Sequence, residues 1–195
     1  MRVAVHGDAR ARDVLTEAGA AVIAADDTSP GRDPLVIGER SLSAGAAAAG
    51  SWLKCGGSVL LLAQEEPGPL PLPAPIRLSS LDTSWGSTPF IFTTGERALT
   101  ALPQAAVLAS ELLSASPDYV YTDLGGRPFA TETAVAVLKP PPGELLGTVV
   151  GRMTVDRGLL TVCQLPLTDA ALAGDPLALA LLSDLLRLSG RPCSP

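Results

Sequence analysis

The sequence predicts an α/β fold in which helices cover both faces of an open, mostly parallel sheet, which gives three layers. Over residues 2–64, strand-like and helix-like segments follow in the order strand, helix, strand, strand, helix, strand. The last of these strands, SVLLLAQ, is apolar throughout, which is typical of a strand covered on both faces. Hydrophobic residues make up 47% of the 195-residue chain, enough for the core of one ordinary domain.

Each element of the first half has a local reason. Residues 2–8 place valine at alternate positions before a glycine, which predicts a buried strand. A helix follows over 9–20 with Gly19 as its C-cap, and two more strands follow at 20–27 and 34–39. A helix rich in alanine and glycine then begins after Ser41 or Ser43 and stops at the glycine pair 56–57, and its small side chains favour close packing on the sheet.

Proline and glycine divide the second half into shorter pieces. The prolines of residues 65–78 predict a stiff surface loop, neither a helix nor a central strand. Short strands are predicted at 88–95, 118–131, 132–140, 143–153 and 157–168, and a short helix at 105–117. The final helix, 175–188, has Asp175 as its N-cap and Pro176 at its first position. We therefore expect one domain over 1–188 and a flexible tail at 189–195.

One pattern occurs twice. GGSVLLLAQ, residues 56–64, and RGLLTVCQLPL, residues 157–167, are both a turn, a strand and a glutamine. This similarity indicates two strands of one sheet, each with a polar group at its carboxyl end.

Composition excludes several classes of function. The net charge is −6 and lysine and arginine do not cluster, which argues against a nucleic-acid or anionic-membrane partner. Three cysteines without C-x-x-C spacing and a single histidine favour neither a disulfide framework nor a metal site. HGDARA lacks the glycines of a dinucleotide-binding turn, so we expect no cofactor. The start of the chain has no signal-peptide pattern, and if the chain is complete we expect a cytoplasmic protein.

The cysteines are predicted to be unreactive. Cys55 follows a helix and precedes a strand, whereas a nucleophile elbow places its residue after a strand and before a helix. The negative end of the helix dipole disfavours a thiolate there, so we interpret Cys55 as a small packing residue. Cys163 lies inside a strand and is expected to be buried, and Cys193 belongs to the tail. Trp52 is expected in the core.

Polar residues at strand ends are the candidate ligand-binding residues. His6 and Asp8 follow the first strand, Glu39 the third and Gln64 the fourth, and ligands of open α/β sheets bind at this edge. His6 with Asp8 is a possible acid–base pair, but simple hydrogen bonding and solvent-facing carboxylates are the common alternative. Trp85 is a candidate for stacking on a sugar, with packing of its loop as the alternative. No catalytic residue is assigned.

A resemblance to known proteins rests on two segments. PLVIGERSLSAGAAAAGSWLKCGGSVLLLAQEEPG resembles a segment of large multi-domain glycoside hydrolases, in which a strand ending in glycine, a helix with an apolar–aromatic pair, Gly-Gly and a strand ending in glutamine mark an accessory domain. RGLLTVCQLPLTDAALAGDPLALALLSDLLRL is similar to the closing portion of such domains. The resemblance implies a flavodoxin-like fold related to class I glutamine amidotransferases, as found in beta-galactosidases and family 2 relatives.

The resemblance implies a domain without chemistry of its own. Its expected role is assembly, shaping of a neighbouring active site or weak sugar contact, and its expected partners are other domains or subunits of a glycoside hydrolase and carbohydrate. Two alternatives stay open. One is a stand-alone binding protein or hydrolase that uses the residues around His6, and the other is a scaffold that forms homo-oligomers.

Overall fold

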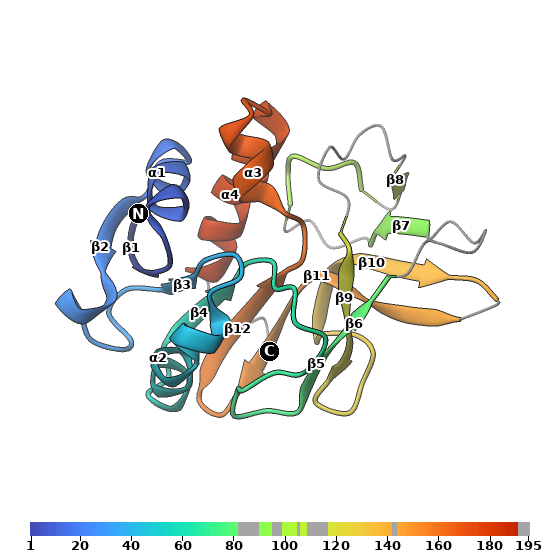
Figure 1. Cartoon of the computed structure of the whole chain (residues 1–195), viewed down its shortest axis with the longest axis horizontal. Helices are drawn as coiled ribbons and strands as arrows, with labels where there is room; N and C mark the ends of the chain where they lie inside the picture. Colours follow the sequence, from blue (N-terminus) through green and yellow to red (C-terminus); the bar gives the residue numbers. More distant parts are fainter. Residues whose placement is uncertain (82–89, 95–98, 105, 109–116, 142–143, 191–195) are drawn as a thin grey trace.

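The computed structural model describes residues 1–81, 90–94, 99–104, 106–108, 117–141 and 144–190. These residues form a mixed α/β fold built on one large sheet, in which twelve strands pair. The sheet has two parts of different character, one parallel and one antiparallel, which meet at β12 (Figure 1).

The parallel half contains five strands in the order β2-β1-β3-β4-β12, and all four of its pairings are parallel. Its helices lie on both faces, with α1, α3 and α4 on one side and α2 on the other (Figure 1). A 3-10 turn, Ala25–Asp27, follows β2. The strands are β1 (Arg2–His6), β2 (Ala21–Ala24), β3 (Leu35–Ile37), β4 (Ser58–Leu61) and β12 (Gly158–Cys163). The helices are α1 (Ala9–Glu17), α2 (Leu42–Lys54), α3 (Leu167–Leu172) and α4 (Pro176–Ser189).

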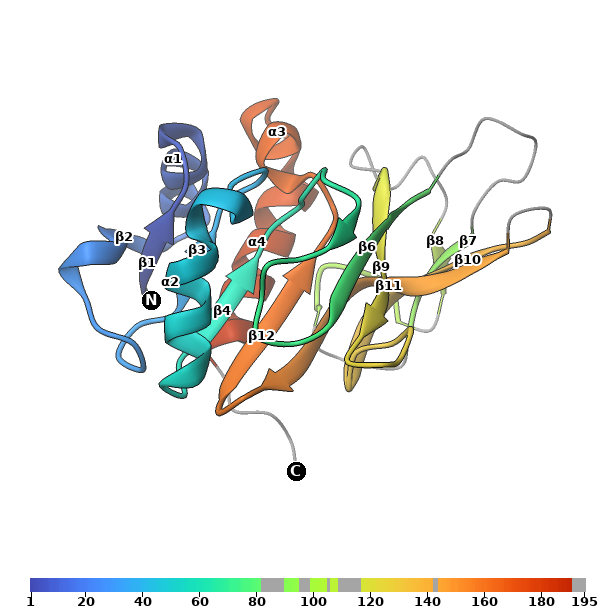
Figure 2. The same cartoon turned by 60° about the horizontal axis from the view of Figure 1, so that its bottom comes forward.

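The antiparallel arm continues the sheet beyond β12. The eleven-residue strand β11 forms a hairpin with β12 and pairs in turn with β10, which leads to β7 and β8. A branch of β9, β6 and β5 joins β11 where Thr148 pairs with Tyr121 (Figure 2). The strands are β5 (Gly68–Pro69), β6 (Ile76–Ser80), β7 (Phe90–Thr93), β8 (Val107–Leu108), β9 (Tyr119–Leu124), β10 (Glu132–Lys139) and β11 (Leu145–Val155).

Two apolar cores lie on opposite faces of the parallel half, and both extend into the antiparallel arm. Alternate residues of a strand point to opposite faces, so Leu60 packs with α1 and α4 while Val59 and Leu61 pack with α2. This explains why β4 is apolar from Val59 to its end. Trp52 is 6% exposed within the second core, as predicted, and its Nε1 donates to the Asp33 carbonyl at 3.1 Å.

The predicted elements of the first half are confirmed, and the second half brings corrections. The sheet is mixed, since only the parallel half has the predicted parallel pairing. Val107–Leu108 is a strand where a helix over 105–117 was predicted, because pairing with β7 overrides the local preference; 105 and 109–116 lie outside the described residues.

Two further differences concern short elements. The proline segment contributes β5 and the start of β6, and Pro69 is tolerated because β5 is an edge strand. Helix α3 was not predicted, and of the predicted tail only residues 189 and 190 are described, as the end of α4 and its C-cap. No helix in the described part of the chain is both long and apolar enough to cross a membrane.

Candidate functional site

The two glutamines of the repeated pattern meet at the carboxyl edge of the parallel half. Strands β4 and β12 are parallel neighbours, and Gln64 and Gln164 follow them. The Gln64 backbone N–H donates to Gln164 Oε1 at 2.8 Å, and Gln164 Nε2 donates to the Gln64 carbonyl at 3.2 Å. Both side chains are buried. The prediction of two strands in one sheet with polar ends is confirmed, and the polar ends bind each other.

The Gln64 side chain supports the start of helix α2. Its Oε1 accepts from the Leu42 backbone N–H at 3.0 Å, and its Nε2 donates to the carbonyls of Gly38, at 3.1 Å, and Leu62, at 2.7 Å. Ser41 is the N-cap residue, as one of two predicted positions, but its hydroxyl donates to the Glu39 carbonyl instead. The first-turn amide of α2 is therefore bound by a residue that follows the next strand, β4.

Glu39 supports the start of helix α3 in the same way. Its Oε1 accepts from the Thr168 backbone N–H at 2.8 Å. Burial raises the pKa of the Glu39 carboxyl above its ordinary value of 4.5, the Thr168 hydrogen bond lowers it, and the nearby Asp169 charge raises it. Glu39 thus binds an amide in the first turn of a helix, 129 residues further along the chain.

Asp8 and Asp175 accept hydrogen bonds from first-turn amides of the other two helices, α1 and α4. Asp8 Oδ1 accepts from the Ala11 N–H at 2.9 Å at the start of α1, and Asp175 Oδ1 accepts from the Leu177 N–H at 2.8 Å at the start of α4. The predicted cap at Asp175 is confirmed. Each of the four α-helices described thus has a first-turn amide bound by a side-chain oxygen.

His6 lies at the end of β1 and packs against helix α2. A Cβ added at Gly45 would lie 2.8 Å from His6 Cδ2, so the half-buried ring occupies the space that a side chain at position 45 would need. The Asp8 carboxylate points to its own helix. The structure therefore brings His6, Asp8, Glu39 and Gln64 to one edge, and the last three bind backbone amides there. Their role toward a ligand stays a prediction.

The cysteines differ from the prediction in one respect. Cys55 lies at the C-cap of α2, before β4, as predicted, but it is exposed and does not pack in a core, because α2 ends at the surface. Cys163 is buried, and burial raises the pKa of its thiol to about 12, so the thiol stays protonated at neutral pH. Trp85 and Cys193 lie outside the described residues.

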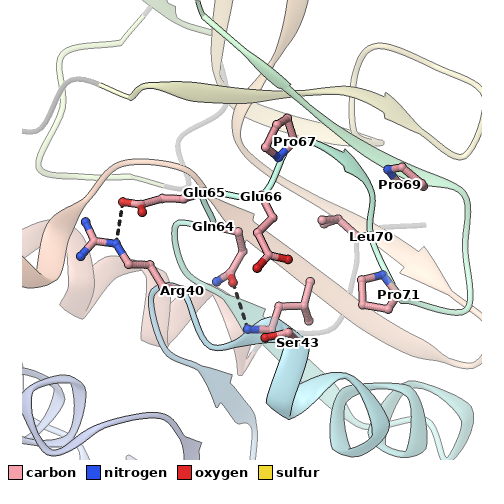
Figure 3. Close-up of a pocket in the computed structure, with 10 residues that line it drawn as sticks. Arg40, Ser43, Gln64, Glu65, Glu66, Pro67, Pro69, Leu70 and Pro71 are labelled. Atoms are coloured by element: carbon pink, nitrogen blue, oxygen red, sulfur yellow. Dashed lines mark hydrogen bonds and ion pairs between the residues drawn. The ribbon is translucent and has the colours of Figure 1, made fainter.

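A pocket of about 220 Å³ opens beside these caps, between the start of α2 and the proline segment (Figure 3). At one end, Arg40 Nε donates to Glu65 Oε1 at 2.5 Å. Arg40 has a φ of 58°, in the left-handed region that non-glycine residues rarely adopt. The lining residues are Arg40, Leu42, Ser43, Gln64, Glu65, Glu66, Pro67, Pro69, Leu70 and Pro71.

Sequence reasoning found Gln64 but missed the rest of this pocket. The missed signal is the doublet Glu65-Glu66 directly after an apolar strand, followed by prolines that fix its direction. Within the described residues, no group of three or more histidine, cysteine, aspartate or glutamate side chains is placed to hold a metal ion.

Comparisons with known proteins find similar folds among solved structures but do not assign the chain to a family. No family model and no curated protein matches the sequence. Among solved structures, Agd3, a carbohydrate deacetylase, is similar with a TM-score of 0.51 at 11% identity, over 95% of this chain and 32% of that chain. A beta-galactosidase from Rahnella sp. R3 gives a TM-score of 0.48 at 13% identity, over 96% and 30%.

This chain spans about a third of the length of each of these proteins. At 11% identity, the likeness to the deacetylase concerns the fold alone. The chain therefore shares its fold with a region of a carbohydrate-processing enzyme.

Proposed function

We propose that this chain is a non-catalytic accessory domain of a carbohydrate-active enzyme, and that it acts in assembly, in shaping a neighbouring active site or in weak sugar contact. A glycoside hydrolase is the enzyme class implied by the sequence resemblance. The deacetylase that shares the fold is also far longer than this chain, which supports a role beside other domains.

We further propose that the parallel half is flavodoxin-like and related to the amidotransferase fold. The strand order β2-β1-β3-β4-β12 supports this, because flavodoxin-like sheets have the order 2-1-3-4-5. Here β12 stands in the place of the fifth strand. Helices on both faces agree with the three layers of that fold.

The observation that carries the proposal is the use of the polar edge residues. Enzymes of open α/β folds place reactive side chains at this edge and leave their polar atoms free for substrate. In this chain the carboxylates of Asp8 and Glu39 and the amide of Gln64 bind the first-turn amides of α1, α3 and α2. The oxygen atoms of these side chains are therefore already hydrogen-bonded to the starts of helices.

Two measurements test the accessory role. The purified chain, assayed with aryl glycosides and with N-acetylated oligosaccharides, is expected to release neither aglycone nor acetate. The endogenous polypeptide, isolated with an antibody against this chain, is expected to carry a carbohydrate-active catalytic unit in the same polypeptide or as a bound subunit. A 19.9 kDa endogenous monomer that turns over either substrate, and loses activity on His6→Ala, would establish the stand-alone hydrolase instead.

A further inference from the structure

We propose that the pocket between α2 and the proline segment binds a single neutral pyranose unit, at the end of an oligosaccharide whose next unit lies along α2. The inference rests on the proposed function for its choice of carbohydrate. It adds a site, its contact residues and a ligand class.

Some polar groups of the pocket already have hydrogen-bond or ion-pair partners within the chain, and others do not. Gln64 binds three backbone groups, and Arg40 and Glu65 bind each other. The Glu66 carboxylate and the Ser43 hydroxyl, both on exposed residues, have no hydrogen-bond partner within the described part of the chain. Figure 3 shows Glu66 pointing into the pocket, toward the side where Ser43 and Leu70 lie, and away from Arg40. A ligand that donates hydrogen bonds to Glu66 and exchanges one with Ser43 fits this arrangement.

The other wall of the pocket is apolar and stiff. It consists of leucine and proline side chains, and the ring of each proline fixes its backbone φ. Such a wall is preorganised for the C–H face of a sugar ring, because little side-chain entropy is lost on contact. The residues are Leu42, Leu70, Pro67, Pro69 and Pro71.

The volume of the pocket fits one sugar unit, and an adjoining groove leaves space for a second unit. The volume of about 220 Å³ lies below the range of roughly 300–1,000 Å³ that holds drug-sized ligands. A second, more open groove shares Pro71 with the pocket and runs along α2. Its floor of small side chains leaves room for a neighbouring unit. The groove is lined by Ala46, Ala47, Gly50, Ser51, Lys54, Pro71 and Pro73.

The charges around the pocket favour a neutral ligand. Glu65 and Glu66 repel an anion, since Arg40 is already paired with Glu65. The N-terminus of α2, where Ser43 lies, carries the positive end of the helix dipole, about half a charge, which offsets part of the Glu66 charge and weakens its attraction for a cation. Hydroxyl groups, which both donate and accept, match this mixture.

The test is a backbone-amide NMR titration of the full chain with galactose, galacturonate, galactosamine and a galactose disaccharide. We expect galactose to shift resonances at 40–43 and 64–71, galacturonate to bind at least about tenfold more weakly, galactosamine to bind no more tightly than galactose, and the disaccharide to add shifts at 46–51. Glu66→Gln is expected to weaken galactose binding about tenfold, because a charged acceptor becomes neutral. Glu17→Gln, with the same charge change on an exposed residue of α1, is expected to leave binding unchanged.

Three results would overturn the site. They are no galactose shifts in a folded chain, shifts confined to other residues, or tighter binding of galactosamine that Glu66→Gln abolishes, which would define an amine site. Each leaves the accessory role standing, since assembly needs no sugar. Turnover of a glycoside or release of acetate would instead remove the accessory role, so the two failures are distinguishable.

Discussion

The parallel half and the antiparallel arm use their surfaces differently. In the parallel half, helices cover both faces and the polar edge residues bind helix starts. In the arm, three apolar residues lie in one cross-strand row and stay at least one-third exposed: Phe90, Leu138 and Leu146. Both parts contribute to the apolar cores, but helices cover the parallel half on both faces, whereas the arm leaves this row of apolar side chains partly exposed.

The largest expected loss of stability comes from adding a side chain at a glycine of the arm that has no space for a Cβ atom. A Cβ at Gly147 of β11 would meet the Val120 side chain and lie 2.5 Å from the Tyr121 carbonyl oxygen. Gly147→Ala should lower the free energy of unfolding by about 3 kcal/mol, as overpacking against backbone does. Gly50→Ala in α2, where the nearest atom is 3.7 Å away, should raise it by about 0.5–1 kcal/mol. Urea denaturation measures both, and equal effects would contradict the register of β9 on β11.

The second largest effect is expected on removing Gln64, the residue after β4 that caps helix α2. Gln64→Ala leaves the Leu42 N–H and the Gly38 carbonyl without their buried partner, and should lower the free energy of unfolding by about 2 kcal/mol. Gln104→Ala is the matched control in the arm, because Gln104 also bonds two carbonyls but is exposed. Its expected loss is below about 0.5 kcal/mol. Similar losses for the two variants would remove the special role of Gln64.

A smaller effect is expected at the local cap of α1. Asp8→Ala removes the acceptor for the Ala11 N–H and should lower the free energy of unfolding by about 1 kcal/mol, while Asp8→Asn keeps an acceptor and should change it little. The thermal midpoint measures both variants. A loss on Asp8→Asn as large as on Asp8→Ala would indicate that the charge of Asp8, and not its hydrogen bond, is what matters.

The smallest effect depends on pH. Burial raises the pKa of Glu39 in the folded chain above its ordinary 4.5, so the folded state holds a proton that the unfolded state releases. The stability that this contributes is present below pH 4.5 and is lost as pH rises through the folded pKa. Glu39→Gln keeps the acceptor without ionising, so its stability relative to wild type should rise from pH 4 to pH 7. A difference that is constant or falls over this range would contradict the assignment.

The sequence could predict features that depend on residues close together in the chain, but not features that depend on residues far apart in it. Asp175 and Pro176 mark the start of α4 by residues that are adjacent in sequence, and the repeated glutamine pattern correctly placed β4 and β12 in one sheet. Helix α3 was missed because it has six residues and its cap, Glu39, lies 129 residues away. The strand at Val107–Leu108 was missed because it depends on pairing with β7.

The site residues show the same division. Asp8 was predicted as a candidate ligand-binding residue, and its position directly before a helix is a cap signal that the prediction did not use, whereas the partners of Glu39 and Gln64 could be known only from the fold. The pocket residues Ser43 and Glu66 lie on different elements, so no sequence spacing brings them together.

Hydrogen exchange of three amides tests most directly whether the polar edge of the parallel half holds helices. The amides of Ala11, Leu42 and Thr168 should be protected in the wild-type chain, since each binds a side-chain oxygen. Asp8→Ala, Gln64→Ala and Glu39→Ala should each speed exchange at the matching amide alone. If all three amides exchange at the rate of exposed loop amides in wild type, or none responds to its own variant, the edge residues do not serve as caps.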